Sequence, residues 1–432
     1  MDLQPGPIRG TRLRTGEVPR SPVLHRAAWV MTMEEPPLCD GAVLTQSGRI
    51  VAVGAFRALR SRCPAQTTVR DHPDCALLPA LVNAHTHLEL TGLEGQIALP
   101  QPGFARWLEE LMPLRRALSA QSQKTALEDG ERRLFQEATA LCADITNGAT
   151  LACRDSFSGT ERTPILEVIG FDRPDLESAL GLEVRASLDA AVGAGTCGGL
   201  GAHACYSTSP PVIREINEAT RTHGLLFSIH VAEHEDEIEF LQTGTGACRD
   251  LLEKLGKWIP GWEPPGSTPI QYLDDLGVLD ERTLLVHCVH LTRQDWQIVA
   301  SRGCSVCFCP RSNRNLNVGR AEIARAAERN IPWALGTDSL ASNRDLSLFA
   351  EACAAMESNP QVSPDEFLRA VTRGGARALH VQQDYGSIRP GKRDALIAVS
   401  LPASLRKAPL SETILYRGNE GEWTWVHHPR PD

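Results

Sequence analysis

The chain has 432 residues, of which 42% are hydrophobic and 22% charged, and its formal net charge is −9. This composition is typical of a globular protein and excludes a disordered chain, a coiled coil and a collagen-like fold. The acidic balance argues against nucleic acid as a partner, because a surface that binds phosphates carries positive charge. No apolar run is long enough to cross a bilayer, so we expect no membrane partner either.

Thirteen cysteines are scattered from Cys39 to Cys353, and no secretory signal precedes them. An odd number of cysteines without an export signal indicates reduced thiols and a cytoplasmic protein. Cys304, Cys307 and Cys309 approach the spacing of a zinc knuckle, but no second Cys/His pair completes one. Since they lie in the alternating, strand-like run CSVCFCP, we interpret them as buried thiols.

The two ends of the chain have the pattern of a small β-domain. Residues 41–54 contain two β-prone runs on either side of Ser47-Gly48, which is a hairpin turn signal. Near the other end, β-prone residues recur in DALIAVS and in TILYRGNEGEWTWVHH. We therefore predict a flexible arm at residues 1–20 and a small β-sandwich domain built from residues 21–75 and 386–432.

The middle of the chain, residues 76–385, alternates short apolar runs with amphipathic stretches such as 104–118 and 321–329. This alternation is typical of repeated βα units and predicts a catalytic (β/α)8 TIM barrel of the α/β class. The alternative, an open doubly wound sheet, would carry a glycine-rich phosphate loop after the first strand, where His-Thr-His stands instead. The eight candidate strands are residues 76–85, 148–155, 165–170, 200–205, 225–231, 283–289, 304–310 and 333–338.

Metal-ligating side chains stand at the ends of several of these strands. The first strand ends in His85 and His87, whose imidazoles project to the same side of an extended segment. His230 ends the fifth strand, His287 lies on the sixth and Asp338 ends the eighth. In a barrel these strand ends meet at the active-site mouth. Imidazoles together with a carboxylate suit one divalent ion, zinc before iron or manganese.

An acidic residue follows this group closely in the sequence. Glu233 lies three residues beyond His230, where the chain turns from strand to helix. A carboxylate beside a metal can take a proton from water and deliver it to a leaving group. His203, at the end of the fourth strand, faces the same mouth. The chain has no lysine between Lys124 and Lys254, so the carbamylated-lysine bridge of two-metal barrels cannot form there, and we predict a single ion.

Six motifs resemble the amidohydrolase superfamily, in the branch of the cytosine, guanine and adenosyl-type deaminases and the triazine chlorohydrolases. The resemblance spans nearly the whole chain, and HTHLEL, EVIGF and CPRSNR are most similar to aminodeoxyfutalosine deaminase-type proteins. The motifs are LPALVNAHTHLEL (78–90), GLGAHACYSTSP (199–210), FSIHVAEHEDE (227–237), LLVHCVHL (284–291), CPRSN (309–313) and ALGTDSLAS (334–342).

The resemblance implies a role for each polar residue of these motifs. Glu233 is the implied proton shuttle, His287 orients water or substrate, and Asp338 completes the catalytic set. The implied metal ligands are His85, His87, His230 and Asp338. The residues expected to contact the substrate are His203, Trp107, Glu89, Arg106 and Ser312.

One departure from the family bears on the substrate. Arg106 precedes Trp107 in this chain. In the similar thioadenosine and adenosylhomocysteine deaminases, a glutamate that binds the ribose precedes the tryptophan. This difference argues against those substrates. Together with Arg311, Arg314 and Arg344, Arg106 could instead face an anionic group, although exposed arginines near a barrel mouth are common.

These observations predict hydrolytic deamination of an aminated heterocycle with release of ammonia. The expected substrate is a small molecule, either an aminodeoxyfutalosine-like nucleoside or another purine or pterin base. One alternative is hydrolysis of another C–N or C–Cl bond, as in triazine hydrolases or cyclic amidases. Another is a non-catalytic binding protein of the same fold. The absence of an expected metal ligand or of Glu233 would favour this alternative, but each of these residues is present. A homodimer is left open.

Overall fold

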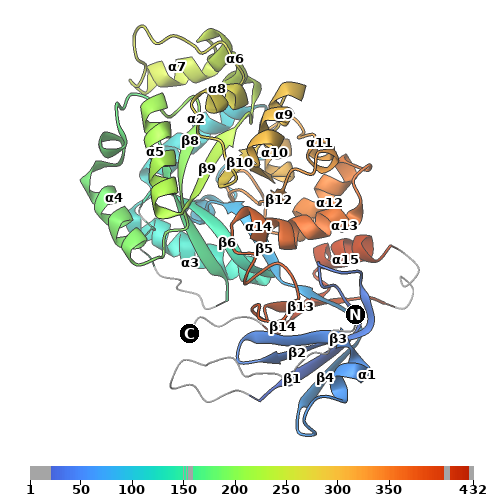
Figure 1. Cartoon of the computed structure of the whole chain (residues 1–432). Helices are drawn as coiled ribbons and strands as arrows, with labels where there is room; N and C mark the ends of the chain where they lie inside the picture. The colour runs from blue at the N-terminus through green and yellow to red at the C-terminus, as the bar shows by residue number, and fades with distance from the viewer. Residues whose placement is uncertain (1–20, 149, 152, 154–158, 403–408, 428–432) are drawn as a thin grey trace.

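The computed structural model describes residues 21–427, apart from residues 149, 152, 154–158 and 403–408. The described strands form one sheet of eight strands and one of six. The larger sheet curls into a barrel among the helices, and the smaller sheet lies beyond one end of it (Figure 1). The predicted α/β class with a (β/α)8 TIM barrel is confirmed, and the described strands of the small domain predicted from both chain ends form a single six-stranded sheet. The expected arm at residues 1–20 lies outside the described residues.

The barrel strands pair in parallel and in chain order. The last strand returns to the first: the backbone N–H of Asp338 donates to the carbonyl of His85 at 3.1 Å, and Thr86 bridges Asp338 in parallel. Barrel closure therefore joins two predicted metal ligands. The strands are β5 (Leu81–Thr86), β6 (Thr139–Thr146), β7 (Glu161–Val168), β8 (Gly199–Ala204), β9 (Leu226–Val231), β10 (Thr283–His287), β11 (Ser305–Phe308) and β12 (Trp333–Leu335).

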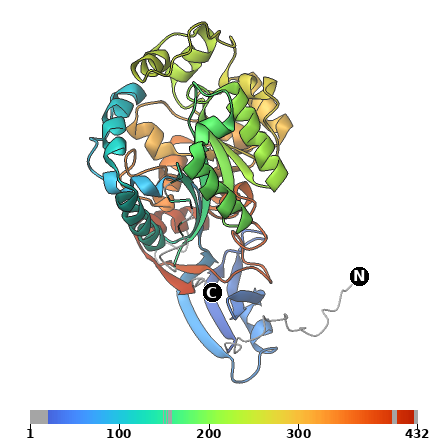
Figure 2. The same cartoon turned by 90° about the vertical axis from the view of Figure 1, so that its left-hand side faces the viewer.

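Helices surround the barrel, and α6 and α7 stand over one end of it (Figures 1 and 2). The amphipathic stretches expected at 104–118 and 321–329 form α2 and α11. No helix among the described residues is long and apolar enough to cross a membrane. The helices are α1 (Phe56–Arg60), η1 (Leu88–Leu93), α2 (Phe104–Ala117), α3 (Ala120–Gln136), α4 (Leu176–Gly193), α5 (Pro210–His223), α6 (Glu235–Thr243), α7 (Ala247–Lys254), α8 (Pro269–Asp275), α9 (Arg293–Arg302), α10 (Pro310–Asn315), α11 (Ile323–Glu328), α12 (Leu348–Ser358), α13 (Pro364–Arg369), η2 (Ala370–Gly374), α14 (Gly375–Ala378) and α15 (Leu410–Asn419).

The smaller sheet combines strands from both ends of the chain in the order β14-β13-β4-β1-β2-β3. Its hairpin turns at Ser47 and Gly48, whose φ angles of 49° and 75° match the left-handed turn that suits a two-residue hairpin. Only Ala80 separates β4 from the first barrel strand, so one extended segment serves both sheets. The strands are β1 (Val23–Val30), β2 (Leu38–Gln46), β3 (Arg49–Ala55), β4 (Thr68–Pro79), β13 (Leu396–Ser400) and β14 (Trp423–His427).

Two predicted elements were wrong. The second barrel strand is β6, at residues 139–146, and the described residues of 148–155 form turns. Asp144 interrupts the apolar pattern of β6, yet it is fully buried because Arg162 donates to it at 3.0 Å. The first part of the β-prone run that begins at Thr413 forms most of α15, which packs on α12, α13 and β13. The last part of the run forms the strand β14, as predicted. Tertiary packing overrides the β propensity of these residues.

Candidate metal centre and active site

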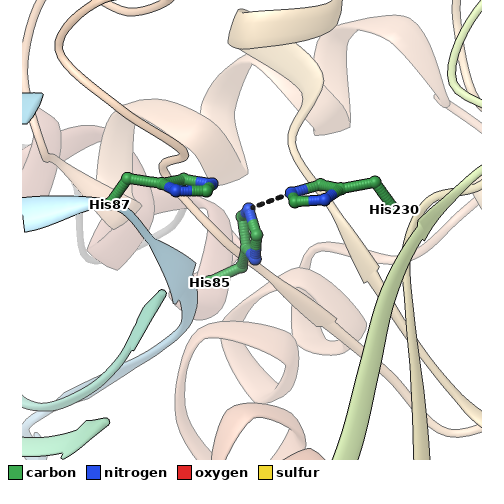
Figure 3. Close-up of side chains that lie close together, drawn as sticks. All are labelled: His85, His87 and His230. Carbon is green, nitrogen blue, oxygen red and sulfur yellow. Dashed lines mark hydrogen bonds between the residues drawn. The ribbon is translucent and has the colours of Figure 1, made fainter. Parts of the chain in front are cut away.

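Three imidazoles from opposite parts of the barrel converge at the carboxyl ends of its strands. His85 is the penultimate residue of β5, His87 follows this strand, and His230 lies on β9; their rings face a common point (Figure 3). Nε2 of His85 lies 3.2 Å from Nε2 of His230, and one nitrogen from each ring lies within 4.8 Å of the others. The Oδ1 atom of Asp338 is 3.8 Å from Nε2 of His85 and 3.6 Å from Nε2 of His87.

This arrangement fits one divalent ion. Two nitrogens bound tetrahedrally at about 2.0–2.1 Å from zinc stand roughly 3.3 Å apart, which is close to the 3.2 Å between His85 and His230. Burial lowers the pKa of His85 well below its ordinary value and that of His87 to about 4. The imidazoles of His85 and His87 are therefore neutral, as metal ligation requires.

Hydroxyl groups hold the carboxylate of Asp338 in place. The hydroxyls of Ser312 and Ser342 donate to its Oδ2 at 2.6 and 2.8 Å, which leaves Oδ1 to face the histidines. Burial alone would raise the pKa of Asp338, but His87, His287 and the Ser312 hydroxyl keep it below its ordinary value. Ser312, expected at the substrate, is fully buried and lies behind this carboxylate.

We call His85, His87, His230 and Asp338 the metal group. His287 and Glu233 face each other beside it, with Nε2 of His287 3.6 Å from Oε1 of Glu233. Nδ1 of His287 donates to Oδ1 of Asn313 at 2.9 Å, so the neutral ring presents Nε2 as an acceptor. Glu233 is 7% exposed, and burial raises its pKa to about 8. A carboxyl group with such a pKa can accept a proton and return it near neutral pH.

The structure also separates Glu233 from the adjacent helix start. His234, not Glu233, is the N-cap of α6: its Nδ1 accepts from the backbone N–H of Glu237 at 3.2 Å. The backbone N–H of Glu233 donates to the buried carboxyl of Glu237 at 3.2 Å. The Glu233 side chain is thus free of capping and turns toward His287.

Left-handed backbone conformations gather around this site. Ala232, His287, Cys288 and Asp338 have φ angles between 49° and 70°, although none is glycine. Such residues typically cost about 1–3 kcal/mol each and cluster at functional sites. Backbone bonds across the mouth stabilise them, such as the one from Cys288 N–H to the carbonyl of Val231 at 3.1 Å.

Glu89 and His203 are two of the expected substrate contacts. The carboxyl of Glu89 is 2% exposed, accepts from the hydroxyl of Thr146 at 2.9 Å and faces Arg115 at 3.9 Å. Burial raises the pKa of Glu89 to about 7. The ring of His203 lies 5.3 Å from that of His230, and its Nδ1 is 2.6 Å from the hydroxyl of Ser207.

The other expected contacts lie farther out. Trp107 donates through Nε1 to the carbonyl of Ala341 at 2.9 Å. Arg106 lies on the exposed side of α2, where it pairs with two glutamates of the same helix. Arg311 donates both terminal nitrogens to Asp345 at 2.6 Å. Arg344 is directed at the carbonyl of Leu99 at 3.4 Å.

Glu167 is a site residue that the sequence reasoning missed. It lies on β7 with its Oε1 3.3 Å from Nδ1 of His230, and Asn147 donates to its Oε2 at 3.1 Å. Burial would raise the pKa of Glu167, but His203 and His230 lower it to about 2. A charged residue near the carboxyl end of an otherwise apolar barrel strand was the available signal. Glu167, His203 and His230 form a second compact group, yet Nδ1 of His230 already donates to the carbonyl of His203 at 2.9 Å.

Comparison with known proteins identifies the family. Residues 76–420 match the model of the amidohydrolase family. The aminodeoxyfutalosine deaminase of Deinococcus radiodurans is 33% identical over 78% of this chain and 81% of its own length. The chain belongs to the amidohydrolase family. The 5-methylthioadenosine/S-adenosylhomocysteine deaminase of Nitratidesulfovibrio vulgaris is 31% identical over 88% of this amidohydrolase and 83% of its own length. The expectation of an enzyme that hydrolyses a carbon–nitrogen bond is confirmed.

Solved structures share the fold of this amidohydrolase over almost all of its length. An adenosine deaminase of Xanthomonas campestris with bound zinc has a TM-score of 0.77 at 24% identity, over 95% of this chain and 94% of its own. The Helicobacter pylori aminofutalosine deaminase in complex with methylthio-coformycin has a TM-score of 0.76 at 22% identity, over 92% of this chain and 96% of its own.

Proposed function

We propose that this amidohydrolase deaminates a 6-aminopurine nucleoside. The observation that carries the proposal is the pairing of Glu233 with His287, at 3.6 Å, directly beside the group of three histidines and Asp338. The named activities of the Deinococcus and Nitratidesulfovibrio relatives support it, since both concern nucleosides that carry an amino group on purine C6. We assign the chemistry to residues 76–385 and treat the sheet from 21–75 and 386–432 as a separate supporting domain.

One divalent ion, zinc in the first place, completes the proposed site. A metal ion in such a site supplies Lewis acidity, which lowers the pKa of water toward 7. The ligands are His85, His87, His230 and Asp338. The carbonyl of His203 accepts from Nδ1 of His230 at 2.9 Å and orients that ring from behind, and the carboxylate of Glu167 lies 3.3 Å from the same nitrogen.

The side chains of this chain handle the protons. Glu233 takes a proton from water, whose oxygen then bonds to C6 of the purine. His287 holds the water through its unprotonated Nε2, since its Nδ1 carries the proton and donates it to Oδ1 of Asn313. Glu233 returns the proton to the amino nitrogen as the C6–N bond breaks, and ammonia leaves. Water is consumed, and the ring keeps an oxygen in place of nitrogen.

Two nucleoside classes remain to be separated. The sequence resemblance and the Deinococcus relative favour aminodeoxyfutalosine, which carries a carboxylate. The Nitratidesulfovibrio relative favours 5′-thioadenosines, although Arg106 stands where a ribose-gripping glutamate is expected. Arg106 and Arg311, two of the arginines that could face an anionic substrate group, are engaged with carboxylates of the chain itself.

Ammonia release by the zinc-loaded enzyme tests the proposal. The panel includes aminodeoxyfutalosine, 5′-methylthioadenosine, S-adenosylhomocysteine, adenosine, guanine, an aminopterin and a chlorotriazine. We expect turnover of at least one adenine nucleoside well above that of the free bases. Turnover confined to chlorotriazines or cyclic amides would overturn the proposal and leave the family assignment intact.

A further inference from the structure

A fully buried carboxylate that belongs to none of the sequence motifs lies on α12. Glu351 is in the first turn of this helix, which packs against α10. Burial raises the pKa of Glu351 to about 7, while Arg311 and the amide of Asn343 oppose that rise. Because a buried carboxylate is costly unless it is hydrogen-bonded, its contacts indicate what the side chain does.

Glu351 connects two loops at the mouth of the barrel. Its Oε2 accepts from the backbone N–H of Arg311 at 3.0 Å, in the first turn of α10. Its Oε1 accepts from Nδ2 of Asn343 at 2.6 Å, in the loop after β12. The two oxygens of one side chain therefore hold the segments that follow β11 and β12.

Through Arg311, Glu351 anchors the start of α10. Ser312 directly follows Arg311, and its hydroxyl donates to Oδ2 of Asp338 at 2.6 Å. A shift of the Arg311 backbone would carry this hydroxyl with it. The contact of Glu351 with the Arg311 N–H thus sets one of the two hydrogen bonds to the Asp338 carboxylate.

Through Asn343, the same carboxylate anchors the loop after β12. Ser342 directly precedes Asn343, and its hydroxyl donates to the same Oδ2 of Asp338 at 2.8 Å. Nδ2 of Asn343 also donates to the carbonyl of Thr337 at 3.0 Å, and Thr337 directly precedes Asp338. Both hydroxyls on Oδ2 are therefore one residue away from a contact of Glu351.

Asp338 needs support of this kind for its orientation. Its φ angle of 56° lies in the left-handed region, which persists in a non-glycine residue only where the surroundings hold it. Its Oδ1 lies 3.6 Å from Nε2 of His87 and 3.8 Å from Nε2 of His85. A rotation of the carboxylate would turn Oδ1 away from these imidazoles.

We propose that Glu351 is a positioning residue: through Ser312 and Ser342 it holds the carboxylate of Asp338 in line with the metal-binding histidines. This inference rests on the proposed function, because it takes Asp338 as a metal ligand. It assigns part of the metal affinity to α12, a helix outside the metal-binding motifs.

Glu351→Gln tests the proposal, because it keeps the size of the side chain. In glutamine one carboxylate oxygen becomes an NH₂ group, which meets an N–H donor whichever way the amide turns. We measure the dissociation constant of zinc by competition with a chelator, kcat and KM at saturating zinc, and the melting temperature of the metal-free protein. We expect zinc to bind about tenfold more weakly or worse and kcat to fall by a similar factor, with KM within about twofold.

Two control variants separate positioning from stability. Asp394→Asn alters a buried carboxylate of the smaller sheet, which lies 2.9 Å from Nδ1 of His427. This variant should lower the melting temperature and leave zinc affinity and kcat at the parent level. Glu357→Gln alters an exposed residue of α12 and should change none of the three measurements.

A mutant cycle shows whether Glu351 acts through the serines. In a Ser312→Ala, Ser342→Ala background, Glu351→Gln should weaken zinc binding by less than about twofold further, because the hydroxyls that it positions are gone. An independent effect would instead multiply the two losses. Should Glu351→Gln fail to fold, Asn343→Ser removes the link to the loop after β12 and serves in its place.

The outcomes separate this inference from the proposed function. Parent-level zinc affinity and kcat in Glu351→Gln, with only the melting temperature lowered as in Asp394→Asn, would overturn the positioning role while deamination stands. A fully multiplied loss in the mutant cycle would overturn it as well. A parent protein that binds no zinc and releases no ammonia from any adenine nucleoside would refute the proposed function itself.

Discussion

Replacing Glu233 by glutamine gives the sharpest test of the assigned chemistry. The substitution keeps the size of the side chain and removes its ability to accept a proton. General acid–base assistance is typically worth about 10²–10⁴ in rate. Since Glu233 is positioned for two successive proton transfers, we expect turnover to fall by about 10⁴ or more, which corresponds to roughly 5.5 kcal/mol of barrier.

The structure also predicts what Glu233→Gln should leave unchanged. Glu233 is not among the proposed metal ligands, so metal content should stay at the parent level. Burial raises its pKa to about 8, so a neutral side chain is well tolerated there and the melting temperature should not fall.

Turnover, metal content and melting temperature of Glu233→Gln are compared with those of Glu235→Gln. Glu235 is an exposed residue in the first turn of α6, two positions away, and its substitution should change nothing measurable. Turnover of Glu233→Gln within about tenfold of the parent, at full metal occupancy, would show that another group carries the proton.

Three further predictions follow from the ligand set and the packing. Metal analysis should find about one equivalent of zinc, iron or manganese, and its removal by a chelator should abolish turnover; two tight equivalents that are both required would contradict a single site. Gly336→Ala places a Cβ 2.8 Å from Cys307 Sγ and from the Cβ and carbonyl of His85. This substitution should lower metal affinity and destabilise the fold by about 1–3 kcal/mol. Gly54→Ala, where the atom nearest to the added Cβ is 3.8 Å away, should do neither. An unchanged metal affinity in Gly336→Ala would refute the predicted effect on the metal site. Burial, with help from His72, lowers the pKa of His25 to about 3, so below pH 6.5 the unfolded chain binds a proton that the fold excludes. Stability should therefore fall as pH drops from 6.5, by about 3 kcal/mol at pH 4; chemical denaturation of His25→Gln should show a smaller loss, and an equal loss would contradict the assignment.

The sequence predicted most of the metal group because its geometry follows from two regular patterns. His85 and His87 are two residues apart on an extended segment, so their side chains share a side. Parallel barrel strands bring their carboxyl ends to one mouth, which places His230 and Asp338 beside them. Neither inference needs knowledge of the loops.

The residues that the sequence did not reveal depend on contacts between distant segments. Asp144 interrupts the apolar pattern of β6, and its partner, Arg162, lies on the next strand. Asn313, within α10, fixes the tautomer of His287, a relation that requires the register of neighbouring strands. The contact of Glu167 could not be predicted from the sequence either, because only the folded barrel places this residue beside His230.

The continuity of β4 with β5 has a consequence for biosynthesis. β4 pairs with β13 on one side, and the N–H of Ala80, at the junction, donates to the carbonyl of Ala395 at 3.0 Å. These partners emerge only after almost the whole chain has been synthesised. Until then β4 presents an unpaired edge, which invites aggregation. A chain that stops before Leu396 therefore leaves β4, which continues into the segment that carries His85 and His87, paired with β1 alone.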